Sequence, residues 1–184
     1  MLENQYTEVL TARNIQKIFT THVIGNYNPL SIFTLALERH FFGIEDATPY
    51  HLTNVLLHLV CVLLVFRCMQ LLGARLWASA LVALLFGIHP MRVESVTWVT
   101  ERKDVLFAAF YFASFSCYLR YLWGKRKEKK WYWWALALFV PALLAKIQAV
   151  FLPLSMLAAD YYRKRPLKWN LEIGRASCRE RVSF

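Results

Sequence analysis

The chain has 184 residues, of which 58% are hydrophobic and 16% aromatic, while only 18% are charged. This composition is too apolar for an ordinary soluble domain and indicates an all-α, polytopic membrane protein. The net charge of +10 is mostly explained by basic flanks of apolar runs, so we expect no nucleic-acid partner.

Residues 1–50 contain no apolar run long enough to span a membrane and no signal peptide. Two short amphipathic stretches, from Ile15 to Ile24 and from Ile32 to Phe42, are suited to lie in a membrane interface. A turn at Asn26-Tyr27-Asn28-Pro29 separates them. We therefore expect residues 1–50 to form an external loop with interfacial helices.

Residues 51–170 contain four apolar runs, and we expect a transmembrane domain of about five spanning or half-spanning helices there. The runs 52–66, with its flank, and 105–123 are long enough to span. The run 76–88 is short and must be tilted or extended by its neighbours. The run 131–159 has basic residues on both sides, so it must enter the membrane and return, turning near Lys146.

Basic residues in 125–130 and 163–168 predict that both flanks face the cytoplasm. Counting back, the run 105–123 passes inward and 76–88 passes outward. Residues 1–50 and 89–104 then lie outside. We expect an integral protein of a bacterial inner membrane with these two regions on the periplasmic side.

Polar residues also occur within the first spanning run. His51, Asn54 and His58 follow the spacing i, i+3 and i+7, which places them on one helix face. They could form a polar seam that bonds to a neighbouring helix, or they could belong to a substrate site, and both readings stay open. The four cysteines show no spacing typical of a metal site or disulfide framework, and we predict no metal ligands.

The segment from His89 to Asp104 carries three acids, three bases and a histidine between two apolar runs. A plain connecting loop needs only turn residues, so this central segment is the candidate for chemistry. Pro90 suits the first turn of a helix. A single helix through the segment would place Glu94, Trp98 and Glu101 on one face, with the two acids about 10 Å apart and therefore in separate roles.

Glu94 and Glu101 are the candidate catalytic residues. Cationic groups, and guanidinium groups in particular, match phosphate oxygens, so Arg92, Arg102 and Lys103 could bind the phosphate of a lipid-linked substrate. Arg102, Lys103 and Asp104 could instead anchor the helix at the headgroup level, and Lys146 could reach the donor phosphate or only extend to the interface. The substrate-binding candidates are His89, Arg92, Arg102, Asp104, Lys146, His51, Asn54 and His58.

Four motifs are specific enough to compare with known families, namely Tyr27 to Leu30, His51 to His58, Leu85 to Asp104 and Leu144 to Pro153. They resemble the membrane part of TMTC-type proteins, the transmembrane and tetratricopeptide-repeat O-mannosyltransferases, and of their bacterial relatives. The resemblance covers roughly residues 5–170. It implies a GT-C-like fold and an enzyme that moves a sugar, mannose-like, from a polyprenyl-phosphate donor to a protein or glycan acceptor on the outer face of the lipid bilayer.

The resemblance further implies displacement at the anomeric carbon with inversion, assisted by a carboxylate base and by cations on the departing phosphate. In such enzymes the catalytic acid lies in an Asp-rich motif after the first span, upstream of this sequence. The repeats that follow the membrane part are missing too. We therefore expect a fragment truncated at both ends and inactive alone. No cofactor is certain, and a role for a divalent metal stays open. Residues 171–184 resemble a translated sequencing-adapter tail and are set aside.

Two other classes of protein remain as alternatives. A transporter would place His51, His58, Glu94 and Lys146 along a polar path, but it should also show an internal repeat of spans, and the sequence shows none. A membrane scaffold without catalysis needs only packing and leaves the charge of the central segment unexplained.

Overall fold

The computed structural model describes residues 11–20, 27–124 and 128–164, and the adapter-like tail lies outside these ranges. The described residues contain helices and no strand, which confirms the all-α prediction. The elements are α1 (Ala12–Thr20), α2 (Pro29–Phe42), α3 (Thr48–Leu71), α4 (Leu76–Ile88), α5 (Pro90–Thr97), η2 (Val99–Glu101), α6 (Arg102–Trp123), α7 (Lys129–Ala145), η3 (Ile147–Phe151) and α8 (Leu152–Lys164), where η marks a short 3-10 helix.

The chain divides into two compact units, residues 1–152 and 153–184. The second unit contains α8 from its second residue onward. All contacts discussed below lie within the first unit.

Two helical stretches are long and apolar enough to cross a membrane, namely α3 and the stretch Val99–Trp123. They confirm the two spans expected from the first and third apolar runs. α4 and α5 meet the same test only as a pair, bent by 55°. The short run 76–88 is therefore extended by its neighbour, as expected, but at an angle.

α3 and α6 run parallel to each other. The Cys61 thiol of α3 donates to the Val105 carbonyl of α6 at 3.5 Å, and the Cys68 thiol donates to the Phe112 carbonyl at 3.7 Å. From the first contact to the second, the position on each helix advances by seven residues, or about two helical turns. The two helices thus keep one register over most of their length.

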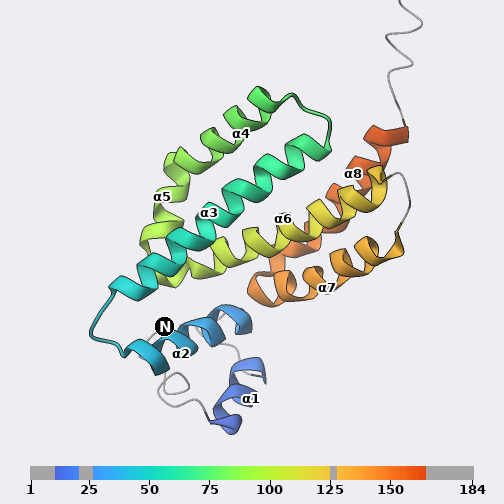
Figure 1. The fold of residues 1–184 in the computed structure, drawn as a ribbon. Coiled ribbons are helices and arrows are strands. Elements are labelled where there is room, and N and C mark those ends of the chain that lie inside the picture. Colours follow the sequence, from blue (N-terminus) through green and yellow to red (C-terminus); the bar gives the residue numbers. More distant parts are fainter. Residues whose placement is uncertain (1–10, 21–26, 125–127, 165–184) are drawn as a thin grey trace, which may run out of the picture. The chain divides into compact units, whose positions relative to one another are not determined.

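α4 and α7 run in the opposite direction, on either side of this pair (Figure 1). His58 of α3 lies 3.0 Å from the carbonyl oxygen of Gly87, near the end of α4. The buried Ser114 hydroxyl of α6 donates to the Ala135 carbonyl of α7 at 2.6 Å. Successive long helices therefore alternate in direction, as the charge pattern predicts.

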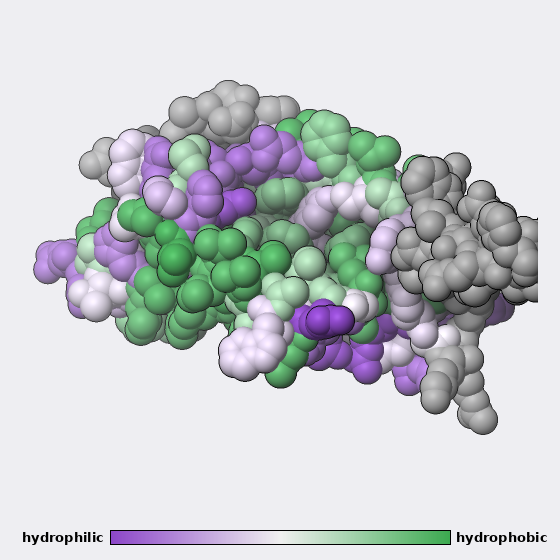
Figure 2. Space-filling view, turned by 90° about the horizontal axis from the view of Figure 1, so that it is seen from above, coloured by the Kyte–Doolittle hydropathy of each residue, from purple (hydrophilic) through white to green (hydrophobic). Residues whose placement is uncertain are grey.

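Large apolar side chains face outward along the helices, as lipid-facing residues do. The face shown in Figure 2 carries a broad apolar area between hydrophilic side chains. The exposed apolar residues of α3 and α4 include Leu52, Leu56, Leu59, Leu63, Leu76, Trp77, Leu81, Leu84, Leu85 and Ile88. With the two spans, they identify an integral membrane protein.

In the N-terminal region, α1 and α2 overlap the two amphipathic stretches expected from Ile15 to Ile24 and from Ile32 to Phe42, while residues 21–26 lie outside the described ranges. Ile18 of α1 is buried against Ile32 and Ala36 of α2. Part of the apolar face of α1 is therefore covered by α2. Phe41 and Phe42, at the end of α2, stay 71% and 58% exposed. A position of this region in the outer interface stays a prediction.

Gly87 lets α4 approach α3 closely. A β-carbon at this position would lie 3.1 Å from a Val62 methyl group. We expect Gly87→Leu to push the helices apart and to lower the free energy of unfolding by about 1–3 kcal/mol. The matched control is Ala80→Leu, because Ala80 is exposed on the same helix. Thermal unfolding in detergent measures both, and equal stability of the two variants would contradict the close packing.

Candidate functional site

The candidate residues lie at one end of the helical bundle. α3 and α6 begin at this end, while α4 and α7 end there, because the long helices alternate in direction. The end therefore collects side chains from His51 to His58, from the central segment and from Lys146. We call it the candidate end.

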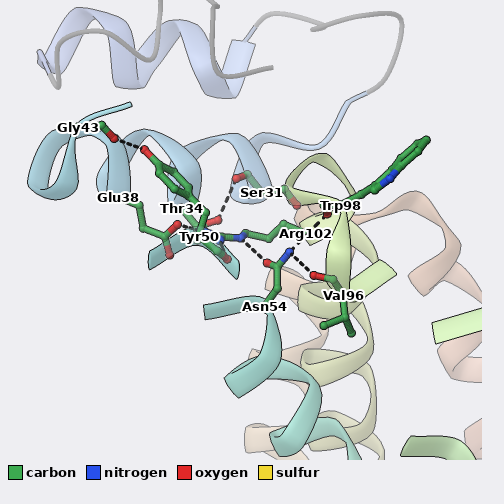
Figure 3. Close-up of polar contacts among 9 residues, drawn as sticks. All are labelled: Ser31, Thr34, Glu38, Gly43, Tyr50, Asn54, Val96, Trp98 and Arg102. Atoms are coloured by element: carbon green, nitrogen blue, oxygen red, sulfur yellow. Dashed lines mark hydrogen bonds and ion pairs between the residues drawn. The ribbon is translucent and has the colours of Figure 1, made fainter. Parts of the chain in front are cut away.

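A fully buried guanidinium occupies the centre of the candidate end. Arg102, the first residue of α6, has a side-chain exposure of 0%. Its Nε donates to the Asn54 Oδ1 at 2.9 Å, and its Nη2 donates to the Tyr50 carbonyl at 2.8 Å. Its Nη1 lies 2.5 Å from the Glu38 Oε2. Figure 3 shows this Arg102 cluster, which consists of Glu38, Tyr50, Asn54 and Arg102.

The Arg102 cluster joins three helices through one cation. Glu38 belongs to α2, Tyr50 and Asn54 to α3, and Arg102 to α6. The contact between Nη1 and Oε2 is an ion pair whose alignment does not meet hydrogen-bond geometry. Removing a charge from water costs several kcal/mol, so a buried guanidinium requires these acceptors. Arg102 therefore holds the N-terminal region against the spans.

Asn54 connects the Arg102 cluster to the central segment. Its Nδ2 lies 3.3 Å from the Val96 carbonyl oxygen and 3.4 Å from the Trp98 carbonyl oxygen. α5 ends just before Trp98, whose backbone is extended at φ −88° and ψ 116°. A second helical segment begins at Val99.

This break corrects the expectation of one helix from Pro90 through Glu101. Glu94 lies on α5 and Glu101 on η2, so the two acids do not share a face of one helix. The physical reason is the extended backbone at Trp98, which interrupts the helical hydrogen-bond ladder. The distance of about 10 Å expected along a single helix does not apply.

The three acids of the central segment differ in their partners. Glu94 is exposed, and its carboxylate forms no ion pair with any residue that the structure describes. Glu101 pairs with Lys103 at 2.9 Å. Asp104 pairs with Lys146 at 2.5 Å, and both side chains are about three-quarters buried. Glu94 is thus the acid most available to a substrate.

Lys146 lies where α7 ends, as the predicted turn requires. Its backbone is extended, and η3 begins at the next residue. Its ammonium group joins the end of α7 to the beginning of α6 through Asp104. A phosphate could bind Lys146 by replacing the Asp104 carboxylate or by sharing the ammonium group with it.

The polar residues near α4 make mostly local contacts. The Nδ1 of His89 accepts a hydrogen bond from the Met91 backbone at 3.2 Å and so caps α5. The Arg92 guanidinium lies 4.9 Å from the centre of the Phe86 ring. The His58 ring stacks on the Phe86 ring, with 5.8 Å between the ring centres.

The predicted polar face of α3 is divided in the structure. Asn54 is buried and bonds to α6 and to the central segment, and His58 contacts α4. His51 is exposed. A polar seam between helices therefore describes the environment of Asn54 and His58. A substrate contact stays a prediction for all three.

Sequence reasoning missed Glu38 and the Tyr50 carbonyl. A signal for Glu38 is present, because it follows Ser31 and Leu35 at i+7 and i+3 and so lies near the buried face of α2. An acid in that position requires a buried cation. The Tyr50 contact uses only backbone atoms, so its side chain gives no signal.

Metal ligands are not grouped at the candidate end. Within residues 11–20, 27–124 and 128–164, no three His, Cys, Asp or Glu side chains lie close enough together to hold a metal ion.

Removing the buried cation should destabilise the fold. Arg102→Met leaves Glu38 buried without its partner, and we expect the free energy of unfolding to fall by about 3–5 kcal/mol. Adding Glu38→Leu should recover much of this loss, because neither charge then remains buried. Lys130→Met is the control, since Lys130 forms an exposed pair with Glu128. Denaturant unfolding in detergent gives the comparison, and parental stability of Arg102→Met would show that the cluster is dispensable.

Comparison with known proteins places the chain in a family. Residues 18–162 match the model of the family described as dolichyl-phosphate-mannose-protein mannosyltransferase. The chain is 32% identical to Protein O-mannosyl-transferase tmtc2 of Xenopus laevis over 163 residues, which are 86% of this chain and 19% of the relative. It is 31% identical to Protein O-mannosyl-transferase TMTC4 of Homo sapiens over 143 residues, which are 68% of this chain and 19% of the relative.

The chain thus spans about a fifth of the length of these curated relatives. No solved structure matches it. The family match includes most of the described residues and all of the candidate end. It confirms the resemblance to TMTC-type O-mannosyltransferases that the four motifs indicate. The chain belongs to the dolichyl-phosphate-mannose-protein mannosyltransferase family.

Proposed function

We propose that the chain forms part of a GT-C-like membrane enzyme that transfers mannose from a polyprenyl-phosphate donor to a protein or glycan acceptor. The observation that carries this proposal is the match to a mannosyltransferase family over residues 18–162. The relatives of this chain are named as protein O-mannosyl-transferases, which favours a hydroxyl group as the acceptor.

The reaction requires a base and a stabilised leaving group. The acceptor oxygen attacks the anomeric carbon, and the bond from that carbon to the phosphate oxygen breaks. The acceptor proton passes to a carboxylate, and polyprenyl phosphate leaves with the bonding electron pair. A positioned carboxylate and nearby cations each lower the barrier of such a displacement.

Glu94 and Arg92 are the strongest candidates for these roles in the described residues. Glu94 is exposed and has no cationic partner among them, so its carboxylate can accept a proton. Arg92 lies two residues away on α5, beside Phe86, with its guanidinium at the candidate end. Glu101 also stays a candidate, but it is already paired with Lys103.

The remaining candidates are placed differently by their contacts. Arg102 has acceptors from two helices and no exposed surface, which favours a structural role over direct phosphate binding. Lys146 is one-fifth exposed, so an incoming phosphate could share its ammonium group with Asp104. His51 and His58 lie on α3, which begins at the candidate end, and His89 caps α5 at the same end.

The charge at the two ends supports a specific orientation. The candidate end carries acids and bases together. The opposite end carries mainly bases in the described residues, namely Arg67, Arg75, Arg120, Lys129 and Lys130. Basic residues favour the cytoplasmic side. We therefore place the candidate end, with residues 27–50 and 89–104, on the periplasmic side of a bacterial inner membrane.

Cysteine labelling tests this orientation. In a background with Cys117→Ser and Cys178→Ser, because Cys117 is only half-buried, Glu94→Cys should react with a membrane-impermeant maleimide in intact spheroplasts. Lys129→Cys should react only after the membrane is opened, because it lies at the basic end of the bundle. Both positions are exposed, whereas Cys61 and Cys68 are buried. The reverse labelling pattern would contradict the proposed orientation.

Substitution of Glu94 tests the proposed chemistry in the product of the complete gene. Glu94→Gln should lower the rate of mannosyl transfer by about 10²–10⁴, because a general base contributes a factor of that size. Arg92→Ala should also slow transfer. The assay follows radiolabelled mannose from mannosyl-phosphoryl-polyprenol in proteoliposomes.

Glu45→Gln is the matched control, since Glu45 is an exposed acid in the connection between α2 and α3. It should transfer at the parental rate. Parental rates for both Glu94→Gln and Arg92→Ala would remove the central segment from the active site. Solute flux without transfer by the parent would favour a transporter instead.

A further inference from the structure

We propose that Asn54 is a positioning residue that fixes the break between α5 and η2, and with it the placement of Glu94 relative to the rest of the site. This inference rests on the proposed function. It starts from the unusual position of Asn54, which is fully buried in α3 and yet contacts residues more than 40 positions later in the chain.

The orientation of the Asn54 amide follows from chemistry. The Nε of Arg102 can only donate a hydrogen bond, so it must face the Asn54 oxygen. The Val96 and Trp98 carbonyls can only accept, so the Asn54 nitrogen must face them. The Asn54 oxygen thus binds the buried guanidinium, and the Asn54 nitrogen contacts the backbone at the break.

The break needs such a donor. The last carbonyls of a helix have no partner within the helix, and Val96 lies in the last turn of α5. Trp98 follows in an extended conformation, and its carbonyl also accepts from the Glu101 backbone at 3.0 Å, which starts η2. Asn54 therefore contacts carbonyls at the end of one segment and at the beginning of the next.

The geometry of the break determines how the exposed groups are presented. Glu94 precedes the break, while Glu101 and Arg102 follow it. The Trp98 side chain points away from the Arg102 cluster (Figure 3) and is 60% exposed, so its own packing does not hold the backbone. A change at the break would move α5 and its carboxylate relative to the spans. Misplacement of a reacting group by about 1 Å can lower a rate by about 100-fold.

Asn54→Asp separates the two contacts of this side chain. It keeps an oxygen for the Nε of Arg102 and almost the same volume. It replaces the nitrogen by an oxygen that faces two carbonyl oxygens. We expect amide hydrogen exchange in residues 96–101 to accelerate about tenfold or more as the break loosens. We expect kcat for mannosyl transfer to fall about 100-fold, while KM for mannosyl-phosphoryl-polyprenol stays within about threefold.

Two further variants give the controls. Glu38→Gln alters the same guanidinium from its other side without touching the break, so it should leave exchange in residues 96–101 at the parental rate. Asn54→Leu removes both contacts, so it should accelerate exchange in this segment and lower the melting temperature as well. All measurements use the product of the complete gene in proteoliposomes at pH 7.5.

The outcomes separate a positioning role from a structural one. Parental exchange in residues 96–101 of Asn54→Asp overturns the proposal. Faster exchange with an unchanged kcat per folded molecule also overturns it, because the break would then not affect the reaction. If the parent transfers no mannose, the proposed function fails. The exchange measurement then still decides whether Asn54 holds the break.

Discussion

The burial of one guanidinium determines how this end of the protein is built. Arg102 begins a membrane-spanning helix with no exposed surface, and a charge in that position is tolerated only with several acceptors. The acceptors come from α2 and α3. If α2 moved away from the spanning helices, the Arg102 guanidinium would stay buried without the Glu38 carboxylate. The Asn54 amide then extends the same contacts to the central segment. The cation thus joins three helices directly, and Asn54 adds the central segment to them.

The spans were predictable because their signal is local. Length and hydropathy alone identify α3 and α6, and the bounds of the run 76–88 coincide with those of α4. Basic flanks predict the alternating direction of the helices. The end of α7 at Lys146 follows from the same charge pattern. None of these features depends on which residues meet across the bundle.

The break at Trp98 was not predictable, because no proline or glycine lies between Met91 and Val105 to mark it. Helical spacing alone favours continuation from Pro90 to Glu101. The structure instead ends α5 early, where an amide from another helix meets the backbone. From the sequence, Asn54 is interpreted as part of a polar seam between helices, and the central segment is interpreted as a functional site. Both interpretations concern the same contact, between the Asn54 amide and the backbone of the central segment.

The pairing of charges was equally beyond local reasoning. Asp104 and Lys146 are 42 residues apart, yet their ion pair closes the hairpin of α6 and α7 at the candidate end. Three acids there, Glu38, Glu101 and Asp104, are paired with cations of the protein itself. A list of charged residues therefore overstates how many are available to a substrate. Glu94 stands out only once these partners are known.

The order of the Arg102 contacts along the chain has a consequence for biosynthesis. Glu38, Tyr50 and Asn54 all precede Arg102, and the chain emerges from the ribosome N-terminal end first. When Arg102 reaches the membrane, every one of its acceptors has already been synthesised, and α3 can have been inserted. The Arg102 guanidinium can then pair with its acceptors as soon as it is buried. The charge therefore need not enter the membrane before partners are present.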